Sequence, residues 1–375
     1  MAESDLVVVG GGPAGLATAV HARLAGMRVT VLDGQGPVID RACGEGLMPA
    51  GRDELDGLGV KLDPVWTAPF AGIRYCEEDD AADGRFPCGC GLGVRRTALH
   101  AALAARAEAL GVDVRWGVGA RGLSERGVET ERGVVRAAYV VGADGRASAV
   151  RRWAGLEHRP GARGRAGVRR HYTIEPWSEF VEVYWAAGAE AYVTPVGPQQ
   201  VGVAILWSGG ASTFDALLPR FPGLQARLSG APVASRDMGG AGFGAVPRTV
   251  ATHRVALVGD AAGSVDPITG VGVTLALRQA RALVAALVAG RPRAYVAAHR
   301  RIMRPSRVLA CLLLLLTRHH RLRRGAIRAL EADPGIFGRL VGLNAGQLPA
   351  RSLGAGSVLL LLRTLRHARA LRHAG

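Results

Sequence analysis

The stretch that decides the fold lies at residues 6–15, which read LVVVGGGPAG. A short apolar run ends there in a glycine-rich turn. Residues 16–25 then have a helical composition, and residues 28–32 (RVTVL) form a second β-branched run that ends at Asp33. Strand, glycine turn, helix, strand and acid follow one another in the order of a single βαβ unit. The sequence therefore predicts a Rossmann-like nucleotide-binding layer at the start of the chain.

Three glycines in the turn, Gly10, Gly12 and Gly15, have the spacing G-x-G-x-x-G. The first makes the tight turn, the second lets the backbone approach a pyrophosphate, and the third lets the helix pack closely on the strand. The phosphates then lie at the positive N-terminus of the helix. Asp33 follows Gly15 by 18 residues, close to the spacing of an acid that holds a ribose hydroxyl. The turn therefore predicts a dinucleotide site.

A second glycine-containing motif indicates which dinucleotide is bound. Residues 259–263 (GDAAG) follow an apolar run, and Gly270 and Gly272 open the next helical segment. The carboxylate of Asp260 suits a ribityl chain, which offers several hydroxyl donors. The glycine pair lets a helix N-terminus approach a flat ring and stabilise negative charge on it, and a reduced flavin carries such charge. The motif therefore favours a flavin dinucleotide.

The remaining patterns predict an α/β chain, α+β overall, in which a second layer interrupts the nucleotide-binding layer. Between residues 165 and 206, short β-rich segments are separated by Gly/Pro turns, which is typical of an antiparallel sheet. We therefore expect an inserted antiparallel β-sheet substrate domain and a helical C-terminal region. The expected parts are a discontinuous FAD-binding domain at 1–155 and 245–290, a β-rich substrate domain at 160–244, and a basic, leucine-rich helical region at 291–375.

The composition excludes several classes of protein. Hydrophobic residues make up 49% of the chain and charged residues 21%, close to the average of globular proteins, so a disordered chain is excluded. No apolar run approaches the roughly 20 residues that span a bilayer. The five scattered cysteines argue against a disulfide framework and fit a reducing cytoplasm, and the first residues lack the basic region of a signal peptide. We therefore expect a cytoplasmic protein without a metal site.

The net charge of +16 is concentrated in the tail. Residues 291–375 contain 17 arginines and two acids, so this region carries +15. Two interpretations remain open: the leucine runs at 308–316 and 358–362 pack on the FAD-binding domain, or they lie in the interface of an anionic membrane, on its inner face. Nucleic-acid binding is not expected, because the tail has almost no aromatic residues to stack on bases.

Five motifs together resemble one superfamily of flavoproteins. They occur in order between residue 6 and about residue 290, as GGGPAG from Gly10, CGEGL at 43–47, RRTALH at 95–100, GADGRASAVR at 142–151 and GDAAGSVDPITGVG at 259–272. They are similar to motifs of the FAD-dependent superfamily that unites single-component aromatic hydroxylases, geranylgeranyl reductases and flavin halogenases. CGEGL and the Asp-Pro pair in the last motif look more like the reductase and halogenase branch.

The resemblance implies that FAD is the cofactor and that a defined set of residues binds it. The set comprises Gly10, Gly12, Pro13, Ala14, Gly15, Asp33, Cys43, Gly44, Arg96, Val118, Asp144, Gly145, Gly259, Asp260, Gly270, Val271 and Gly272. Within it, Asp260 would contact the ribityl chain. Asp144 and Gly145 would contact both the cofactor and a visiting nicotinamide.

The resemblance also suggests residues on the substrate side. A strand–turn–strand segment that begins at Tyr192 looks like the one that roofs the flavin in this superfamily, and Tyr192 and Pro195 would line the substrate pocket. In the reductase branch, a cysteine at the place of Cys43 lies near the flavin. It would either donate a proton or only shape the pocket. His100 and His171 lack a supporting constellation, and we expect both to be structural.

The leading functional hypothesis is an NAD(P)H-dependent monooxygenase. It would hydroxylate or epoxidise a hydrophobic aromatic, polyketide or isoprenoid substrate through a flavin C4a-hydroperoxide. The alternative is a geranylgeranyl-reductase-like enzyme that saturates alkene bonds. A halogenase ranks lower because the W-x-W-x-I-P motif of tryptophan halogenases is absent, and so does a non-catalytic, membrane-docked flavoprotein. The chain has no second G-x-G-x-x-G unit between a strand and a helix, so NAD(P)H would visit the flavin as a transient reductant.

Overall fold

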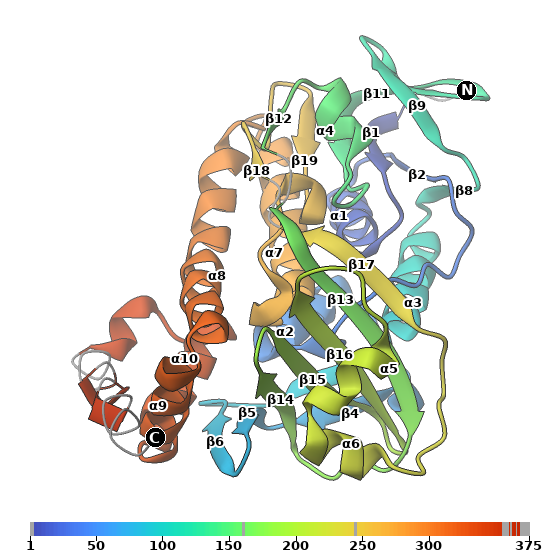
Figure 1. Cartoon of the computed structure of the whole chain (residues 1–375). Coiled ribbons are helices and arrows are strands. Elements are labelled where there is room, and N and C mark those ends of the chain that lie inside the picture. The colour runs from blue at the N-terminus through green and yellow to red at the C-terminus, as the bar shows by residue number, and fades with distance from the viewer. Residues whose placement is uncertain are drawn as a thin grey trace.

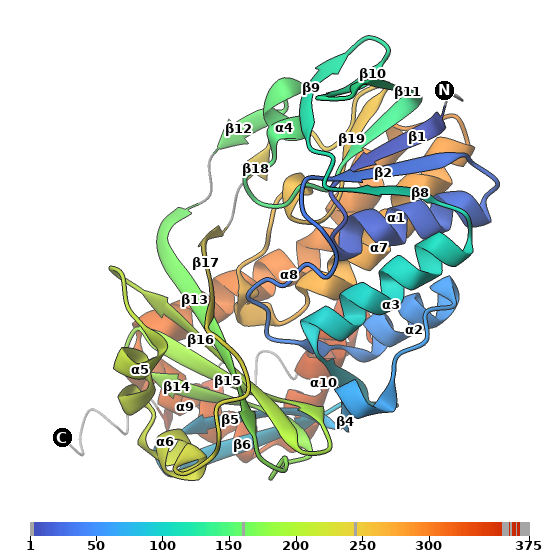
Figure 2. The same cartoon turned by 90° about the vertical axis from the view of Figure 1, so that its right-hand side faces the viewer.

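Two large β-sheets and a set of C-terminal helices make up the computed structural model, which describes residues 4–159, 162–243, 246–354, 360, 362–364 and 366–367. Figure 1 shows the two sheets as separate layers, with helix α8 (Ala294–Arg318) running from the first layer to the second. Figure 2 shows helices stacked beneath the strands of the first layer, and the second layer beside them.

The first sheet agrees with the predicted nucleotide-binding layer. Its parallel strands run in the order β8 (Asp113–Trp116), β2 (Val29–Asp33), β1 (Ser4–Val9), β11 (Gly133–Gly142) and β19 (Val255–Leu257). Near-continuous apolar runs such as that of β1 are typical of parallel strands. The first half of β11 continues into an antiparallel extension made of β10 (Gly127–Thr130) and β9 (Ala120–Ser124).

Helices follow the strands of this sheet as the glycine motifs predict. Helix α1 (Pro13–Leu24) packs against two others, α3 (Arg96–Ala109) and α7 (Gly272–Val288). Smaller elements complete this half of the molecule: β3 (Gly46–Leu47), α2 (Pro49–Leu58), β4 (Thr67–Phe70), β7 (Gly91–Val94), α4 (Ala149–Trp153), β12 (Glu157–Arg159) and β18 (Val246–Pro247). The βαβ unit therefore forms where the opening stretch places it.

The second sheet contains seven strands and differs from the expected insertion in one respect. Its order is β17 (Met238–Phe243), β13 (Ala162–Thr173), β16 (Gln200–Ser208), β15 (Ala189–Gly197), β14 (Phe180–Ala186), β5 (Gly72–Glu77) and β6 (Asp80–Arg85). The hairpin β5–β6 comes from residues that we expected in the FAD-binding domain, and β5 pairs with β14 in parallel. Strand β14 would otherwise be an unpaired edge, and β5 covers it. The ends of the predicted domain, residues 160 and 244, lie outside the described residues.

The two faces of this sheet have different surroundings because side chains alternate along each strand. One face, called here the outer face, packs under the short helices α5 (Phe214–Leu217) and α6 (Pro222–Leu228). The opposite face, called here the inner face, packs against the C-terminal helices and the turn that precedes α7. The inner face of β15 carries Glu190, Tyr192 and Thr194, and that of β13 carries Arg165, Arg169 and His171.

Part of the basic tail packs on the second sheet. After α8, the chain forms α9 (His320–Glu331) and α10 (Pro334–Asn344), and both contact the hairpin β5–β6. The guanidinium of Arg323 is buried and pairs with the buried carboxylate of Glu77, while Arg324 and Arg328 both pair with Asp80. These arginines therefore neutralise acids of the second sheet, whereas the packing interpretation of the tail expected solvated arginines and contacts with the FAD-binding domain.

Helix α8 nevertheless leaves an apolar stripe uncovered. Val308, Leu312 and Leu315 are 56%, 56% and 45% exposed, and Cys311 on the same side is exposed too. Exposed arginines flank this stripe at both ends. None of the helices in the described part of the chain combines the length and apolarity needed to cross a bilayer. The second leucine run, 358–362, lies mostly outside the described residues.

Candidate functional site

The opening glycine turn has the geometry that its predicted tasks require. Gly10 has a φ of +111°, and a Cβ on it would lie 2.4 Å from the carbonyl oxygen of Ala143. A Cβ on Gly15 would lie 1.9 Å from the carbonyl oxygen of Gly10, so the helix packs directly on the turn. A Cβ on Gly12 would meet no atom within 4 Å. The second glycine therefore borders open space, which suits a pyrophosphate that approaches the backbone.

The end of strand β2 closes this turn. The carboxylate of Asp33 accepts hydrogen bonds from the N–H groups of Gly11 (2.7 Å) and Gln35 (2.8 Å), and its carbonyl oxygen accepts one from the N–H of Val118 (2.9 Å). His100 is buried, and its Nε2 lies 2.9 Å from the carbonyl oxygen of Gly11. His100 therefore supports the turn, as we expect of a structural residue. Asp33 fixes the turn by bonding the backbone N–H of Gly11.

The second motif lies against the first. A Cβ on Gly259, which has a φ of +61°, would lie 2.7 Å from the Cβ of Ala14 in helix α1. Asp260 has accessible surface, yet desolvation by the surrounding protein raises its pKa above the ordinary value. The second motif therefore places an accessible acid beside the first glycine turn, where a ribityl-binding carboxylate is expected.

The turn before α7 is also built for close approach to a ring. Gly270 has a φ of +67°, in the left-handed region that favours glycine, and the buried Val271 separates it from the first helical residue, Gly272. A Cβ on Gly272 would meet no atom within 4 Å. The positive end of a 17-residue helix is therefore open to a negatively charged ring.

The buried side chain of Arg96 tests whether the residues around these motifs fit a cofactor. Its side chain is only 7% exposed, and its Nη1 has no hydrogen-bond partner in the part of the chain that the structure describes. Burial lowers the pKa of this guanidinium, while the carboxylates of Asp40 and Glu45 oppose that shift. A buried guanidinium with an unpaired nitrogen is expected to bind an acceptor. The phosphate and carbonyl oxygens of FAD provide such acceptors.

Asp144 has a role that its motif alone did not indicate. Its two carboxylate oxygens accept hydrogen bonds from the Ser148 hydroxyl (2.5 Å) and from the N–H groups of Ala149 (2.7 Å) and Val150 (3.0 Å). Asp144 therefore caps the N-terminus of α4. Gly145 beside it has a φ of +79°. The contact of both residues with the cofactor stays a prediction.

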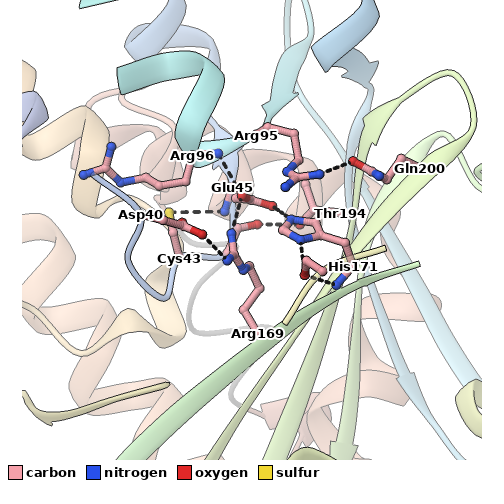
Figure 3. Close-up of polar contacts among 11 residues, drawn as sticks. Asp40, Cys43, Glu45, Arg95, Arg96, Arg169, His171, Thr194 and Gln200 are labelled. Carbon is pink, nitrogen blue, oxygen red and sulfur yellow. Dashed lines mark hydrogen bonds and ion pairs between the residues drawn. The ribbon is translucent and has the colours of Figure 1, made fainter. Parts of the chain in front are cut away.

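A buried network centred on Glu45 was missed in the sequence analysis (Figure 3). Glu45 lies in the CGEGL motif, is 4% exposed and has a φ of +59°. Its Oε1 accepts hydrogen bonds from the backbone N–H of Arg96 (2.8 Å) and from Nη1 of Arg169 (2.9 Å). Its Oε2 lies 2.6 Å from Nε2 of His171, whose Nδ1 lies 2.8 Å from the Ser235 hydroxyl. Glu45 therefore ties the motif to helix α3 and to strand β13.

The network keeps Glu45 ionised. Burial opposes ionisation, but the hydrogen bond and charge of His171 and the charge of Arg169 outweigh it and hold the pKa of Glu45 below its ordinary value. Nη2 of Arg169 also donates to Asp40 at 2.9 Å. Figure 3 shows Arg169 and His171 pointing toward Glu45, whereas the side chain of Arg96 points away from the network. His171 is therefore held in a constellation. One sequence signal could have indicated this network. Side chains alternate along a strand, so Arg169 and His171, two residues apart, lie on the same face.

Cys43 lies next to this network. Its sulfur accepts a hydrogen bond from the N–H of Glu45 (3.3 Å) and lines a small cavity together with Arg96, Leu47 and Val273. Burial raises the pKa of the Cys43 thiol, although the charge of Arg96 acts in the opposite direction. The sulfur therefore carries its proton at neutral pH.

Strand β15 brings the second sheet to these motifs. The hydroxyl of Tyr192 donates to the carbonyl oxygen of Ile268 (3.1 Å), two residues before Gly270. The hydroxyl of Thr194 donates to the carbonyl oxygen of Gly44 (2.7 Å). Pro195 instead lies against β7, because a Cβ on Gly93 would lie 1.7 Å from the Pro195 carbonyl oxygen. The structure thus places Tyr192, but not Pro195, beside the turn that precedes α7.

Comparisons with known proteins agree with this geometry. Residues 3–202 match a family model described as an FAD binding domain. The chain is 28% identical to digeranylgeranylglycerophospholipid reductase 1 of Methanothermobacter thermautotrophicus, over 72% of this chain and 73% of that protein. It is 30% identical to 6-methylpretetramide 4-monooxygenase of Streptomyces rimosus, over 74% of each chain. A crystal structure of a flavoprotein/dehydrogenase from Cytophaga hutchinsonii has a TM-score of 0.79 at 18% identity and covers 100% of both chains, which shows the fold alone.

Proposed function

Since the chain belongs to the FAD binding domain family and is an FAD-dependent oxidoreductase, we propose that it reduces a carbon–carbon double bond of a hydrophobic substrate. Electrons would come from NAD(P)H, and bound FAD would supply the hydride. The substrate would be an isoprenoid chain or an aromatic polyketide that carries one. The observation that carries this proposal is the position of Cys43, which lines the small cavity together with Arg96 and accepts a hydrogen bond from the N–H of Glu45.

The chain's own contribution to the reaction is a proton. Saturation of an alkene adds a hydride to one carbon and a proton to the other, and the S–H bond of Cys43 breaks as the proton leaves. The resulting thiolate would be stabilised by the charge of Arg96 and by the N–H of Glu45, and solvent would return the proton. Glu45 itself stays ionised and holds Arg96 and β13 in place.

Monooxygenation is the second candidate, and one observation favours it. The 30% identity to 6-methylpretetramide 4-monooxygenase of Streptomyces rimosus extends over 74% of this chain. An apolar interior on the inner face of the second sheet would exclude water from an oxygen-transfer reaction, as it would from hydride transfer. The two reactions differ in their products, because reduction adds two hydrogen atoms and monooxygenation adds one oxygen atom.

The experiment uses the FAD-loaded protein with NADPH and with two probes, geranylgeraniol and geranylgeranyl-hydroquinone. Mass spectrometry of the products and oxygen uptake are measured together. Reduction predicts a product two mass units heavier than the probe without stoichiometric oxygen uptake. A product 16 units heavier, with one oxygen consumed per NADPH, would assign the second candidate instead.

Variants of two cysteines test the proton donor. Cys43→Ser should lower turnover by about 10²-fold or more at unchanged FAD content, because a hydroxyl is a much weaker acid than a thiol. Cys76→Ser is the matched control, since Cys76 is also a partly buried thiol with a raised pKa but lies outside the cavity. Wild-type turnover in Cys43→Ser would remove this residue from the reaction.

We also propose that the protein associates peripherally with an anionic membrane through α8. The stripe formed by Val308, Leu312 and Leu315 is long enough to lie in an interface, and Arg301 and Arg318 are exposed at its two ends. Each arginine near such a surface contributes about 1 kcal/mol to binding. A hydrophobic substrate would be drawn from the same bilayer.

Co-sedimentation with vesicles tests this association. We expect the protein to bind phosphatidylglycerol vesicles in low salt, to bind less as salt rises, and to lose most binding in Leu312→Glu. Leu24→Glu is the matched control, since Leu24 is 50% exposed on α1. Equal binding by both variants, or no binding by the wild type, would contradict the proposal.

A further inference from the structure

A second buried carboxylate lies on the inner face of the second sheet, apart from the Glu45 network. Glu190 of β15 is 0% exposed and pairs with Arg165 of β13. Nε of Arg165 lies 3.0 Å from an oxygen of Asp266, so the two acids share one guanidinium. Glu190 therefore receives only part of the compensation that a buried charge needs.

Three buried polar atoms at this place have no hydrogen-bond partner in the part of the chain that the structure describes. They are Oε2 of Glu190, Nε1 of Trp185 and Nε of Arg165, and the last of these still lies 3.0 Å from a carboxylate oxygen of Asp266. Trp185 stands directly opposite Glu190 in the β14–β15 ladder, so the two side chains leave the same face as neighbours. Buried polar groups are nearly always paired in folded proteins. An unpaired acceptor beside an unpaired donor matches a hydroxyl group, which both donates and accepts.

The surroundings indicate what the hydroxyl is attached to. The ring of Tyr75 stands edge-on to Trp185 at a centroid distance of 5.5 Å, and Tyr192 lies two residues along β15 from Glu190 on the same face. Both rings pack among apolar side chains of the sheet, α8 and α10. Aromatic walls of this kind favour an aromatic ring. Because the Tyr192 hydroxyl bonds the carbonyl oxygen of Ile268, this group of residues lies next to the turn before α7.

We propose that Glu190 and Trp185 bind a phenolic hydroxyl of the substrate and orient its ring on the substrate side of the FAD site. This inference rests on the proposed function and names the part of the substrate that the site recognises. It predicts that the substrate is a phenol or hydroquinone with a hydrophobic chain, rather than a chain alone.

Ionisation adds a pH signature to this contact. Burial raises the pKa of Glu190 to about 7, while Arg165 opposes the shift. Asp266 and Arg323 are the other charged groups that act on Glu190, and Tyr75 and Tyr192 are the titratable but neutral groups beside it. Above the pKa, the carboxylate is the stronger acceptor for a phenol, which itself stays protonated to about pH 10. Phenol binding should therefore tighten between pH 6 and pH 8.

The experiment measures binding of two probes to the FAD-loaded protein by equilibrium dialysis. The probes are 4-dodecylphenol and its methyl ether, which lacks the donor. We expect the wild type to prefer the phenol at least tenfold at pH 8, and Glu190→Gln and Trp185→Phe each to lose most of this preference. Glu190→Gln should also lose the pH dependence.

Matched controls come from the outer face of the same sheet. Glu182→Gln and Trp207→Phe make the same two changes there, where Glu182 bonds Trp177 and Tyr184 and where Nε1 of Trp207 bonds the carbonyl oxygen of Gly210. Both should keep the wild-type preference. Equal wild-type affinity for the two probes, or an unchanged preference in both inner-face variants, would overturn the inference. If alkene reduction occurs without this preference, only the inference fails; if the preference holds but no reduction occurs, only the proposed function fails.

Discussion

Glu45 and Glu190 are both buried, and each pairs with an arginine of strand β13, yet they differ in ionisation. Glu45 receives hydrogen bonds from Arg96, Arg169 and His171, so both of its oxygens are occupied, and its pKa is held below the ordinary value. Glu190 shares Arg165 with Asp266, keeps one oxygen unpaired, and has a pKa raised to about 7. The number of donors that reach a buried carboxylate, rather than its burial, therefore decides its charge.

The difference separates two roles for buried glutamates that pair with arginines of the same strand, β13. A fully bonded carboxylate fixes the segments that bond to it, because removing it leaves cations buried without a partner. A partly bonded carboxylate can still take up a proton or a new hydrogen bond. We therefore expect that replacing Glu45 mainly lowers the stability of the fold. Replacing Glu190 should mainly weaken ligand binding.

The largest expected effect comes from Glu45→Ala. It leaves Arg169 with only Asp40 and His171 with only Ser235, so we expect a loss of about 3–5 kcal/mol in the free energy of unfolding. Denaturant titration of the FAD-loaded protein measures it. Glu190→Ala is the comparison, and its loss should be smaller because Arg165 keeps Asp266. A larger loss in Glu190→Ala would reverse the assignment of roles.

A smaller effect is expected from Arg169→Lys. Lysine keeps the charge but lacks the planar fork with which Arg169 reaches Glu45 and Asp40 together. We expect a loss of about 1.5–3 kcal/mol, the value of one hydrogen bond to a charged group. The same titration measures it, with Arg121→Lys as a control, since the Arg121–Glu131 pair is exposed. Equal losses in the two variants would show that the fork of Arg169 contributes nothing.

The pH dependence of stability should have opposite signs at the two sites. The folded-state pKa of Glu190 is raised from 4.5 to about 7, so the folded state binds more protons between these two values. The stability that Glu190 contributes therefore falls by about 3 kcal/mol as pH rises through this window. The pKa of Glu45 is lowered, so its contribution is present above its ordinary pKa and is lost only in acid. Denaturation of Glu190→Gln and Glu45→Gln against the wild type from pH 4 to pH 8 tests both signs. Parallel profiles for the two variants would contradict them.

The smallest effect is expected from Ser235→Ala. The Ser235 hydroxyl contacts Nδ1 of His171 and accepts a hydrogen bond from its backbone N–H, but it does not touch Glu45 itself. We expect a loss of about 1 kcal/mol. Thermal unfolding measures this loss. A loss as large as that of Glu45→Ala would mean that Ser235, and not Glu45, holds the network together.

Local patterns predicted the parts of the molecule whose residues are close in sequence. The βαβ unit, its glycines and the β-rich segments were recognisable because turn chemistry and side-chain periodicity act over a few residues. The contacts of Glu45 with Arg169 and His171 span 124 and 126 residues, and nothing in a local pattern indicates which distant side chains meet. The pairing of β5 with β14 was not foreseen for the same reason, because the two strands are distant in the chain.

The basic tail shows the same limit of prediction from local sequence. Its net charge was visible in the sequence, but charge alone does not tell whether an arginine pairs with an acid or faces solvent. Arg323, Arg324 and Arg328 pair with acids of the hairpin more than 240 residues earlier, while α8 keeps its exposed arginines and leucines on the surface. The structure therefore shows packing of α9 on the second sheet, while the association of α8 with a membrane stays a proposal.

The pairing of Glu77 with Arg323 has a consequence for synthesis on the ribosome. The two residues are 246 positions apart, and both are buried. At about 5–20 residues per second, the hairpin that carries Glu77 leaves the ribosome many seconds before its cation exists. Until helix α9 emerges, the hairpin cannot bury that acid without leaving its charge uncompensated. The edge of the second sheet that carries Glu77 can therefore close with its charge compensated only after the chain has been made as far as Arg323.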